Sequence, residues 1–286
     1  MNRLWAHIWA ASFSTCIGGI FLPACAHDDS TLYIQQVVFP PTPTNQLGCI
    51  YLSPNTTTPG EFSGEFDVQL ASSYSPVVIV GNQLVTRGDS TQARTETNRV
   101  QLRGAVVRVT DSQGNQISTF TSLTEGTVDP SQGNTPGIAQ AAITIIDPAT
   151  AGALRSILTN RSARKTVLTY FKVFGQTLGG TYVESGEFQH VVNVCAGCLV
   201  TFPSDAINTT IATKDQPVNC ELGFPTGTQI NGTSVALPCE MGQDQPIDCR
   251  ICHGIPACDP RISTWCNPAQ PNCPTGTTCS PLGFCQ

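Results

Sequence analysis

The chain has 286 residues, enough for one large or two small domains. Only 12% of them are charged, roughly half the usual share, and the net charge is −6. This low, acidic charge argues against a basic surface for nucleic acid, so no nucleic-acid partner is expected.

The N-terminus has the pattern of a secretory signal peptide. Arg3 is the only charged residue before Cys25, and an apolar stretch runs from Leu4 to Leu22. A basic start, an apolar run and a small-residue cleavage site together predict a signal peptide at residues 1–24. A transmembrane helix is the alternative, but polar residues and glycines dilute the stretch and disfavour it.

The segment Leu22-Pro23-Ala24-Cys25 resembles the bacterial lipobox, in which the cysteine is diacylated and becomes the new N-terminus. By that resemblance Cys25 carries a lipid anchor, and residues 25–46 form the attachment site, a tether and the first strand. Each buried methylene of such an anchor contributes about 0.8 kcal/mol to membrane binding. By resemblance to better-known lipoproteins, Ala26 in place of Asp after the cysteine favours the outer membrane as the location. Ala24-Cys25-Ala26 also fits ordinary signal cleavage, which would give a secreted protein instead.

Cysteine is the strongest signal in the composition. Fourteen are present, and setting aside Cys16 in the signal and Cys25 at the lipid site leaves twelve. An even number in an exported protein predicts a disulfide framework. The candidates are Cys49, Cys195, Cys198, Cys220, Cys239, Cys249, Cys252, Cys258, Cys266, Cys273, Cys279 and Cys285. Because they concentrate late in the chain, we expect a body at residues 47–195 and a small, irregular, disulfide-stapled region at 196–286.

Nine segments rich in Val, Ile, Phe and Thr precede this region, and Gly, Pro, Asn and Asp separate them. The predicted strands are Leu32–Phe39, Gly48–Leu52, Phe66–Ala71, Val77–Val85, Arg99–Val109, Gln116–Phe120, Ile138–Ile146, Lys165–Phe174 and Tyr182–Val194. This spacing predicts a mainly β fold, an antiparallel β-sandwich that is immunoglobulin-like in style. Hairpin turns are predicted at Asp111–Asn115 and at Gly179-Gly180.

The predicted strand Arg99–Val109 has an interrupted alternation. Past Gly104, strict alternation would place Arg108 on the apolar face. A bulge near Gly104 restores the pattern and turns Val107 and Val109 inward.

One short helix is predicted after Asp147. This residue can cap the helix, and Pro148 suits its first position. The expected apolar stripe consists of Leu154, Ile157 and Leu158. The cations expected toward its C-terminal end, where the helix dipole favours them, are Arg155, Arg161 and Arg164. We expect this helix to close one end of the sandwich.

Five of the eleven arginines fall between Arg87 and Arg108. A functional interpretation is a face for an anionic ligand such as a polysaccharide or lipid headgroups. The favoured interpretation is a solvated strand face whose charges are balanced by Asp89, Glu96 and Asp111. Arg87-Gly88-Asp89 is also a tripeptide of eukaryotic adhesion proteins, but three residues carry almost no specificity.

Cys249-Arg-Ile-Cys252-His253 satisfies the C-x-x-C-H pattern for covalent c-type haem. Two thioether cysteines and an adjacent axial imidazole are what this attachment requires. Ten other cysteines crowd the mature chain, and Pro256 interrupts the helix that usually follows such a site. No cofactor is therefore expected, and haem remains the alternative.

Two further alternatives concern the C-x2-C pairs Cys195/Cys198 and Cys249/Cys252. Together they could hold a four-cysteine zinc site, but their separation exceeds the common spacing and an oxidising compartment favours disulfides. Either pair could instead be a redox dithiol, although neither precedes a helix in a βαβ pattern. No metal is therefore expected.

Several longer motifs resemble a group of myxobacterial-type cell-surface lipoproteins with a cysteine-rich C-terminal region. They are the runs 81–89 and 96–105, the segment Glu184–Phe188 before Cys195-Ala-Gly-Cys198, and Gly242–Pro246 before Cys249. The resemblance covers most of the mature chain. It implies a lipid anchor, a β-sandwich-like body and a cysteine-stapled tail, and it supplies no catalytic residue.

The sequence does not favour an enzyme, because it has no G-x-S-x-G elbow, H-E-x-x-H pair or P-loop. Glu184 and Glu187 could form an acid–base pair, but an exposed strand rim is the favoured interpretation. We therefore expect a non-enzymatic, lipid-anchored cell-surface protein that binds or spaces an extracellular or envelope ligand. The alternative is a c-type haem electron-transfer protein that uses Cys249, Cys252 and His253.

Overall fold

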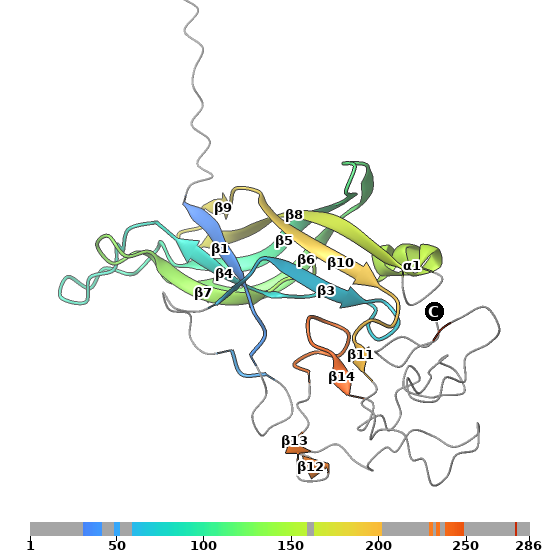
Figure 1. Cartoon of the computed structure of the whole chain (residues 1–286). Helices are drawn as coiled ribbons and strands as arrows, with labels where there is room; N and C mark the ends of the chain where they lie inside the picture. Colours follow the sequence, from blue (N-terminus) through green and yellow to red (C-terminus); the bar gives the residue numbers. More distant parts are fainter. Residues whose placement is uncertain are drawn as a thin grey trace, which may run out of the picture.

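A computed structural model describes residues 31–41, 49–51, 59–158, 163–201, 238–248 and 278, and the backbone of two short strands at 229–230 and 233–234. Two β-sheets and one helix surround a single apolar core (Figure 1). The fold is therefore mainly β, a sandwich with one short helix, as the sequence predicts. Within the described part of the chain, no helix is long and apolar enough to cross a membrane.

The smaller sheet has four antiparallel strands in the order β2-β1-β4-β7. They are β1 (Leu32–Val38), β2 (Gly60–Glu61), β4 (Val77–Asn82) and β7 (Gly137–Ala142). β4 lies in the middle of this sheet and is almost entirely buried, which suits its apolar sequence VVIVGN.

The larger sheet has the strand order β3-β10-β8-β5-β6, and the short β9 pairs with β8. Its strands are β3 (Ser63–Asp67), β5 (Val100–Asp111), β6 (Gln116–Val128), β8 (Arg164–Thr177), β9 (Tyr182–Glu184) and β10 (Phe188–Cys195). β3 runs parallel to β10, so this sheet is mixed where an antiparallel one is predicted. At the other edge, β6 is joined to the smaller sheet by side-chain bonds, such as that from Thr124 Oγ1 to the Ala142 carbonyl at 2.7 Å.

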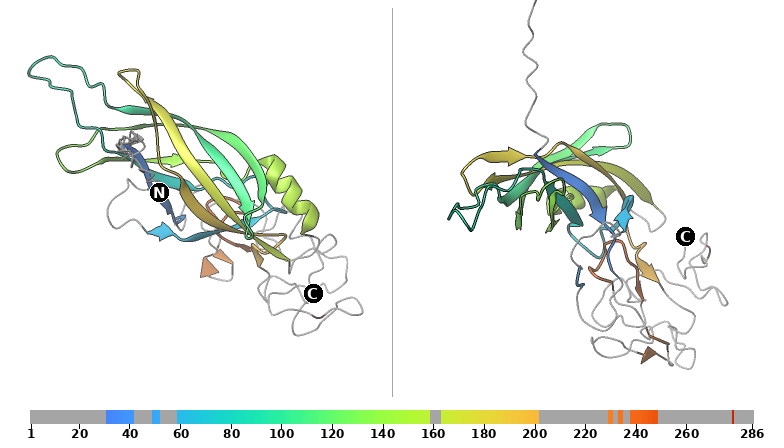
Figure 2. Two further views of the ribbon diagram at one scale, coloured as in Figure 1. Left: turned by 90° about the horizontal axis from the view of Figure 1, so that it is seen from above. Right: turned by 90° about the vertical axis from the view of Figure 1, so that its left-hand side faces the viewer.

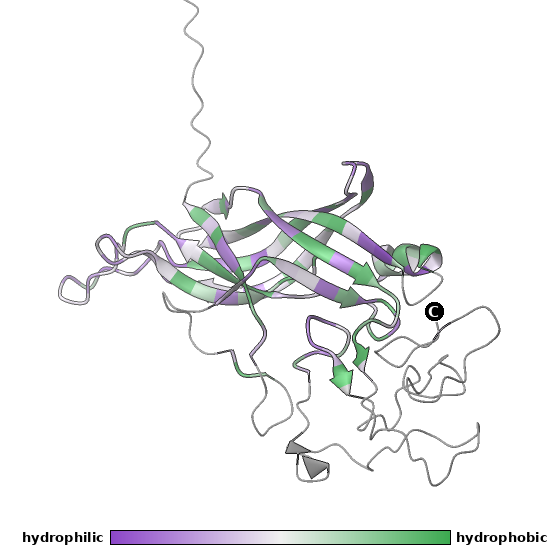
Figure 3. Ribbon diagram, viewed as in Figure 1, coloured by the Kyte–Doolittle hydropathy of each residue, from purple (hydrophilic) through white to green (hydrophobic). Residues whose placement is uncertain are grey.

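Alternating apolar and polar residues place one face of each strand in the core (Figure 3). In β5 the pairing register shifts between Leu102 and Gly104 against both neighbouring strands. This confirms the predicted bulge, and Val107 and Val109 beyond it are fully buried. The predicted turn at 111–115 joins β5 to β6, and the turn at Gly179-Gly180 joins β8 to β9.

The predicted helix is α1 (Pro148–Ile157), at the end of the sandwich opposite the loop that precedes β5 (Figure 1). Asp147 caps it by accepting a hydrogen bond from the Thr150 N–H at 2.9 Å. The predicted apolar stripe is only partly right: Leu154 is buried, Ile157 is 54% exposed, and the buried Leu158 lies just past the helix end. Of the predicted C-terminal cations, Arg155 lies in the last turn, Arg164 begins β8 instead, and Arg161 lies outside the described residues.

Several predicted strands are wrong in detail. β3 begins and ends earlier than the predicted strand Phe66–Ala71. In the range 48–52, the described residues Cys49–Tyr51 form no strand. The range 182–194 is two strands, because the pairing register with β8 shifts between Glu184 and Phe188. Ser185 lies at this irregularity, is buried, and bonds to both backbone polar groups of Val173.

Of the cysteine-rich region, the segment at 196–201 and residues 238–248 pack against the sandwich near β3, below it in Figure 1 and in the right-hand view of Figure 2. β11 (Val200–Thr201) pairs in parallel with β14 (Ile247–Asp248), and β12 (Gln229–Ile230) forms a small hairpin with β13 (Thr233–Ser234). The domain boundary at 195/196 stays a prediction. Residues on both sides of it, Val194 and Ala196, belong to the same apolar core.

Candidate functional site

The structure describes four of the twelve disulfide candidates, and they form two disulfides, Cys49–Cys239 and Cys195–Cys198. Cys25 and His253 lie outside the described residues. So do the other candidates, Cys220, Cys249, Cys252, Cys258, Cys266, Cys273, Cys279 and Cys285. The lipid anchor and the haem alternative therefore stay predictions.

The disulfide Cys49–Cys239 ties the segment after β1 to the cysteine-rich region, with a Cα–Cα distance of 5.0 Å. Gln245 reinforces it. Its Oε1 accepts a hydrogen bond from the Cys239 N–H at 2.7 Å, and its Nε2 donates to the carbonyls of Pro40 and Pro41, both at 3.3 Å. One amide side chain thus bonds to both sides of the connection.

The disulfide Cys195–Cys198 closes a tight loop at the end of β10 above the buried carboxylate of Asp67. Asp67 accepts hydrogen bonds from the N–H groups of Gly197 at 2.7 Å, Leu199 at 3.0 Å and Gln69 at 3.0 Å. These bonds offset the cost of burying its charge. The carboxylate and the two sulfurs lie within 4.8 Å of one another, but sulfurs in a disulfide are not thiolate ligands. The structure therefore does not support a zinc site that uses this pair.

A second polar cluster lies where residues 238–248 dock on the sandwich; we call it the acidic seam and define it as Glu61, Glu65, Tyr74, Glu240 and Asp244. The Asp244 carboxylate accepts hydrogen bonds from the Glu65 N–H at 2.8 Å and the Tyr74 hydroxyl at 2.9 Å. The Asp244 N–H donates to the Glu65 carbonyl at 2.8 Å. Glu61 Oε2 is buried with no hydrogen-bond partner among the described residues.

Three carboxyl groups of the acidic seam, those of Glu61, Asp244 and Glu240, have raised pKa values. Burial, followed by repulsion from Asp244, raises the pKa of Glu61 to about 8. Burial also raises the pKa of Asp244 to about 6, against the lowering effect of its two hydrogen bonds, and raises the pKa of Glu240. Desolvation disfavours the ionised carboxylate, so the seam retains protons at pH values where exposed carboxyls lose them.

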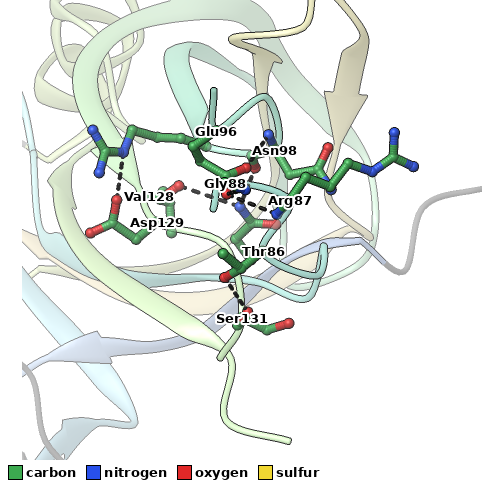
Figure 4. Close-up of polar contacts among 10 residues, drawn as sticks. Thr86, Arg87, Gly88, Glu96, Asn98, Val128, Asp129 and Ser131 are labelled. Carbon is green, nitrogen blue, oxygen red and sulfur yellow. Dashed lines mark hydrogen bonds and ion pairs between the residues drawn. The ribbon is translucent and has the colours of Figure 1, made fainter. Parts of the chain in front are cut away.

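A third cluster organises residues 83–99, which we call the arm. The arm projects from one end of the sandwich, on the left in Figure 1, and runs beside the loop after β6. The Glu96 carboxylate accepts hydrogen bonds from the N–H groups of Arg87, Gly88 and Asn98 at 2.9, 2.8 and 2.6 Å (Figure 4). Desolvation alone raises the pKa of Glu96, but these backbone bonds outweigh it and the net pKa is lowered.

The arm is also bonded to the sandwich. Thr86 Oγ1 donates to the Ser131 carbonyl at 2.7 Å, and Arg99 pairs with Asp129 at 2.6 Å (Figure 4). Asp89 bonds within the arm to the N–H and hydroxyl of Thr91 at 2.9 and 2.7 Å. The Gly88 N–H and the Asp89 carboxylate of the adhesion-like tripeptide thus already have internal partners.

The predicted balance of the arginine-rich segment needs correction. Asp89, Glu96 and Asp111 bond chiefly to the turns around them and form no ion pair with an arginine among the described residues. Arg99 pairs with Asp129, and Arg108 pairs with Glu187 at 3.0 Å. Of the five arginines in this segment, Arg87, Arg94 and Arg103 form no ion pair with a described residue.

Glu184, Glu187 and His190 have structural surroundings. Glu184 lies 3.7 Å from Lys172 and Glu187 pairs with Arg108, so both belong to an exposed strand rim. His190 is 2% exposed in β10, and burial lowers its pKa to about 4, so it is neutral in the folded protein. The residues missed by the sequence reasoning are Asp67 and the acidic seam, because their partners come from distant parts of the chain.

No protein-family model matches this chain, and neither does any curated protein.

Proposed function

We propose that this chain is an exported, non-enzymatic protein of the cell envelope, lipid-anchored through Cys25, that binds or spaces a partner outside the cell. The observation that carries the proposal is the disulfide Cys49–Cys239, which connects segments 190 residues apart. Disulfides form and persist in oxidising compartments and are rare in the cytosol. A second disulfide, Cys195–Cys198, supports the same environment.

The binding or structural role is supported by three buried or half-buried carboxylates whose hydrogen bonds fix the backbone around them. Asp67, Glu96 and Asp244 each accept backbone N–H groups and thereby fix a loop, the arm and the docked segment 238–248. Carboxylates that accept backbone hydrogen bonds hold the surrounding backbone in one conformation. They support a rigid scaffold that presents surfaces, which is what a binding or spacing protein requires.

The anchor is tested by expressing the full chain and its Cys25→Ser variant in a Gram-negative host and separating each with Triton X-114. We expect the parent protein in the detergent phase and the variant in the aqueous phase, because the variant lacks the thiol that accepts the lipid. Equal partitioning of the two proteins would overturn the anchor.

The intact mass of the same membrane-purified protein tests the haem alternative. If all twelve mature cysteines form disulfides, twelve become alkylatable only after reduction. A haem-sized mass that survives reduction, with ten alkylated cysteines, would instead make the protein a c-type cytochrome and refute the proposed function.

A further inference from the structure

The outer face of the larger sheet carries the exposed Tyr182 and the half-buried Phe174. Arg103, beside Gly104 in the register opposite Phe174, has no ion pair among the described residues. Side chains on a strand alternate between faces, so every second residue of β8 turns outward, including Lys172 and Phe174. Phe174 lies opposite Glu184 of β9 in the pairing register, and Tyr182 follows on the same outward face. We call Arg103, Phe174 and Tyr182 the aromatic platform.

The two rings of the platform form a continuous apolar surface. The centroids of Phe174 and Tyr182 lie 6.2 Å apart, and their planes are inclined by only 26°. The Phe174 ring leans over Gly104, where a Cβ would come within 2.9 Å of it, so a side chain at this position would lift the ring. Tyr182 is 61% exposed and Leu123, across Gly104 on β6, is 84% exposed. No described residue shields Tyr182 or Leu123 from solvent to any large extent.

The charges around the rings leave one cation without a partner. Lys172 is paired with Glu184, and Arg108 is paired with Glu187 and lies 4.1 Å from the centroid of the Tyr170 ring. Arg103 is the bulged residue between Leu102 and Gly104, is exposed, and has no ion pair within the described part of the chain. Glu125 on the neighbouring strand β6 does not pair with it either.

We propose that the aromatic platform binds an acidic polysaccharide. The faces of a sugar ring present C–H groups, which pack on exposed aromatic rings, while its hydroxyls stay at the rim in contact with polar groups. The free guanidinium of Arg103 supplies the charge complementary to a sugar carboxylate and can bind it through two parallel hydrogen bonds. The inference rests on the proposed envelope location, where such a polymer is available, and it names the partner of the proposed binding role.

The test uses the soluble full-chain Cys25→Ser protein and polygalacturonate as the probe, with binding measured by affinity electrophoresis. Arg103→Gln and Tyr182→Ala should each weaken binding by about tenfold, the loss typical of a central contact in an interface. Both side chains are exposed, so both variants are expected to fold. Glu125→Gln should leave binding unchanged or strengthen it, because it removes a negative charge near the ligand.

Matched controls separate the platform from general effects of charge and apolar surface. Arg94→Gln removes the same charge from the arm, and Phe62→Ala removes an aromatic ring that is 95% exposed away from the platform. Both should bind like the parent. Equal losses in Arg103→Gln and Arg94→Gln, or absence of binding by the parent, would overturn the proposal.

Two further probes decide the class of ligand. Binding to neutral dextran as tight as to polygalacturonate would refute the requirement for acidic groups. Binding to phosphatidylglycerol vesicles that is lost in Arg103→Gln, without binding to polygalacturonate, would assign the platform to membrane headgroups instead. Because the tested protein lacks Cys25, failure here leaves the detergent-partitioning result unaffected, so the two proposals fail separately.

Discussion

Removal of the Cys49–Cys239 disulfide should lower the free energy of unfolding far more than removal of Cys195–Cys198. The cysteines of the first are 190 residues apart and those of the second are 3 apart. In the chain-entropy model, a crosslink restricts the unfolded chain in proportion to the logarithm of the loop it closes. The expected losses are about 5 kcal/mol for the long loop and about 2 kcal/mol for the short one.

The comparison requires two double variants, Cys49→Ala/Cys239→Ala and Cys195→Ala/Cys198→Ala, so that no unpaired thiol can form a wrong disulfide. Urea denaturation measures the free energy of unfolding of each against the parent. Thermal unfolding gives a second measurement, in which a loss of about 5 kcal/mol corresponds to a decrease in Tm of roughly 10 to 20 °C for a domain of this size.

A larger loss on removing Cys195–Cys198 would refute this reasoning. Cys195 is fully buried and its loop is bonded to Asp67, so such a result would mean that local packing outweighs the restriction of the unfolded chain. Equal m-values in the three proteins would show that the comparison reports stability and not a change in the compactness of the unfolded state.

Four further perturbations test the local geometry. Gly64→Ala should destabilise the protein by about 1–3 kcal/mol in urea denaturation, because the added methyl overlaps the buried Tyr74 hydroxyl. Gly152 is exposed within α1 and has open space around it, so Gly152→Ala should stabilise the protein by about 0.4–1 kcal/mol in the same assay. The free energy of unfolding should fall as pH rises from 6.5 through 8, because Glu61 keeps its proton to about pH 8 only in the folded protein; Glu61→Gln should flatten this slope, and an unchanged slope would assign the proton to another group. Glu96→Gln weakens the bonds that hold the arm, so limited trypsin digestion should cut the arm faster than in the parent, and equal rates would count against Glu96 as its anchor.

The choice of pH window in the Glu61 experiment follows from the opposite effect of His190. Its folded pKa is lowered to about 4 by burial, so the unfolded protein gains a proton below about pH 6.5 while the folded protein does not. His190 by itself therefore contributes stability as pH rises from 4 to 6.5, and over that range it opposes the fall caused by Glu61 and Asp244. Above pH 6.5 the unfolded His190 loses its remaining proton, so its opposing effect fades and the slope is increasingly set by Glu61.

The strands and their faces could be predicted because they depend on local patterns. The bulge at Gly104 is visible in the sequence as a slip of alternation, and Asp147 followed by Pro148 marks the start of α1. The two sheets follow from such segments, since each must bury its apolar face. The prediction of one strand at 182–194 failed because no local pattern reveals that Ser185 turns inward to bond Val173.

The contacts between distant segments could not be predicted. The Asp244 carboxylate accepts a hydrogen bond from the N–H of Glu65, which lies 179 residues earlier in the sequence. Cys239, the disulfide partner of Cys49, lies 190 residues after it. Spacing does not encode such pairings, because any of twelve cysteines could in principle meet another. β3 was misplaced for the same reason: its parallel pairing with β10 is set by tertiary contacts, and the expected strand starting at Phe66 begins at Ser63 and ends at Asp67.

The arginine-rich segment shows where a general rule misleads. Asp89 and Asp111 are expected from the sequence to balance the charge of the nearby arginines, yet both carboxylates accept N–H groups two residues further along the chain. Aspartates that begin turns commonly make this local bond. The sequence contained the signal for this local bond, because Asp111 opens the predicted hairpin turn. The local bond to the backbone determines the partner of Asp111 more than the nearby positive charges do.

The acidic seam and the Cys49–Cys239 disulfide hold the same docked segment by different chemistry, so their effects should be coupled. In the parent, the disulfide keeps residues 238–248 close to the sandwich when Glu61 and Asp244 ionise, and the folded state must bear the cost of their charges. In Cys49→Ala/Cys239→Ala the segment can undock when the seam ionises, which returns both carboxyls to water.

The fall in stability between pH 6.5 and 8 should therefore be shallower in the disulfide-free variant than in the parent, measured as the pH slope of the free energy of unfolding. Parallel slopes would show that docking survives ionisation without the disulfide. In that case the hydrogen bonds of Asp244 to Glu65 and Tyr74 alone would be strong enough to hold the charged segment in place.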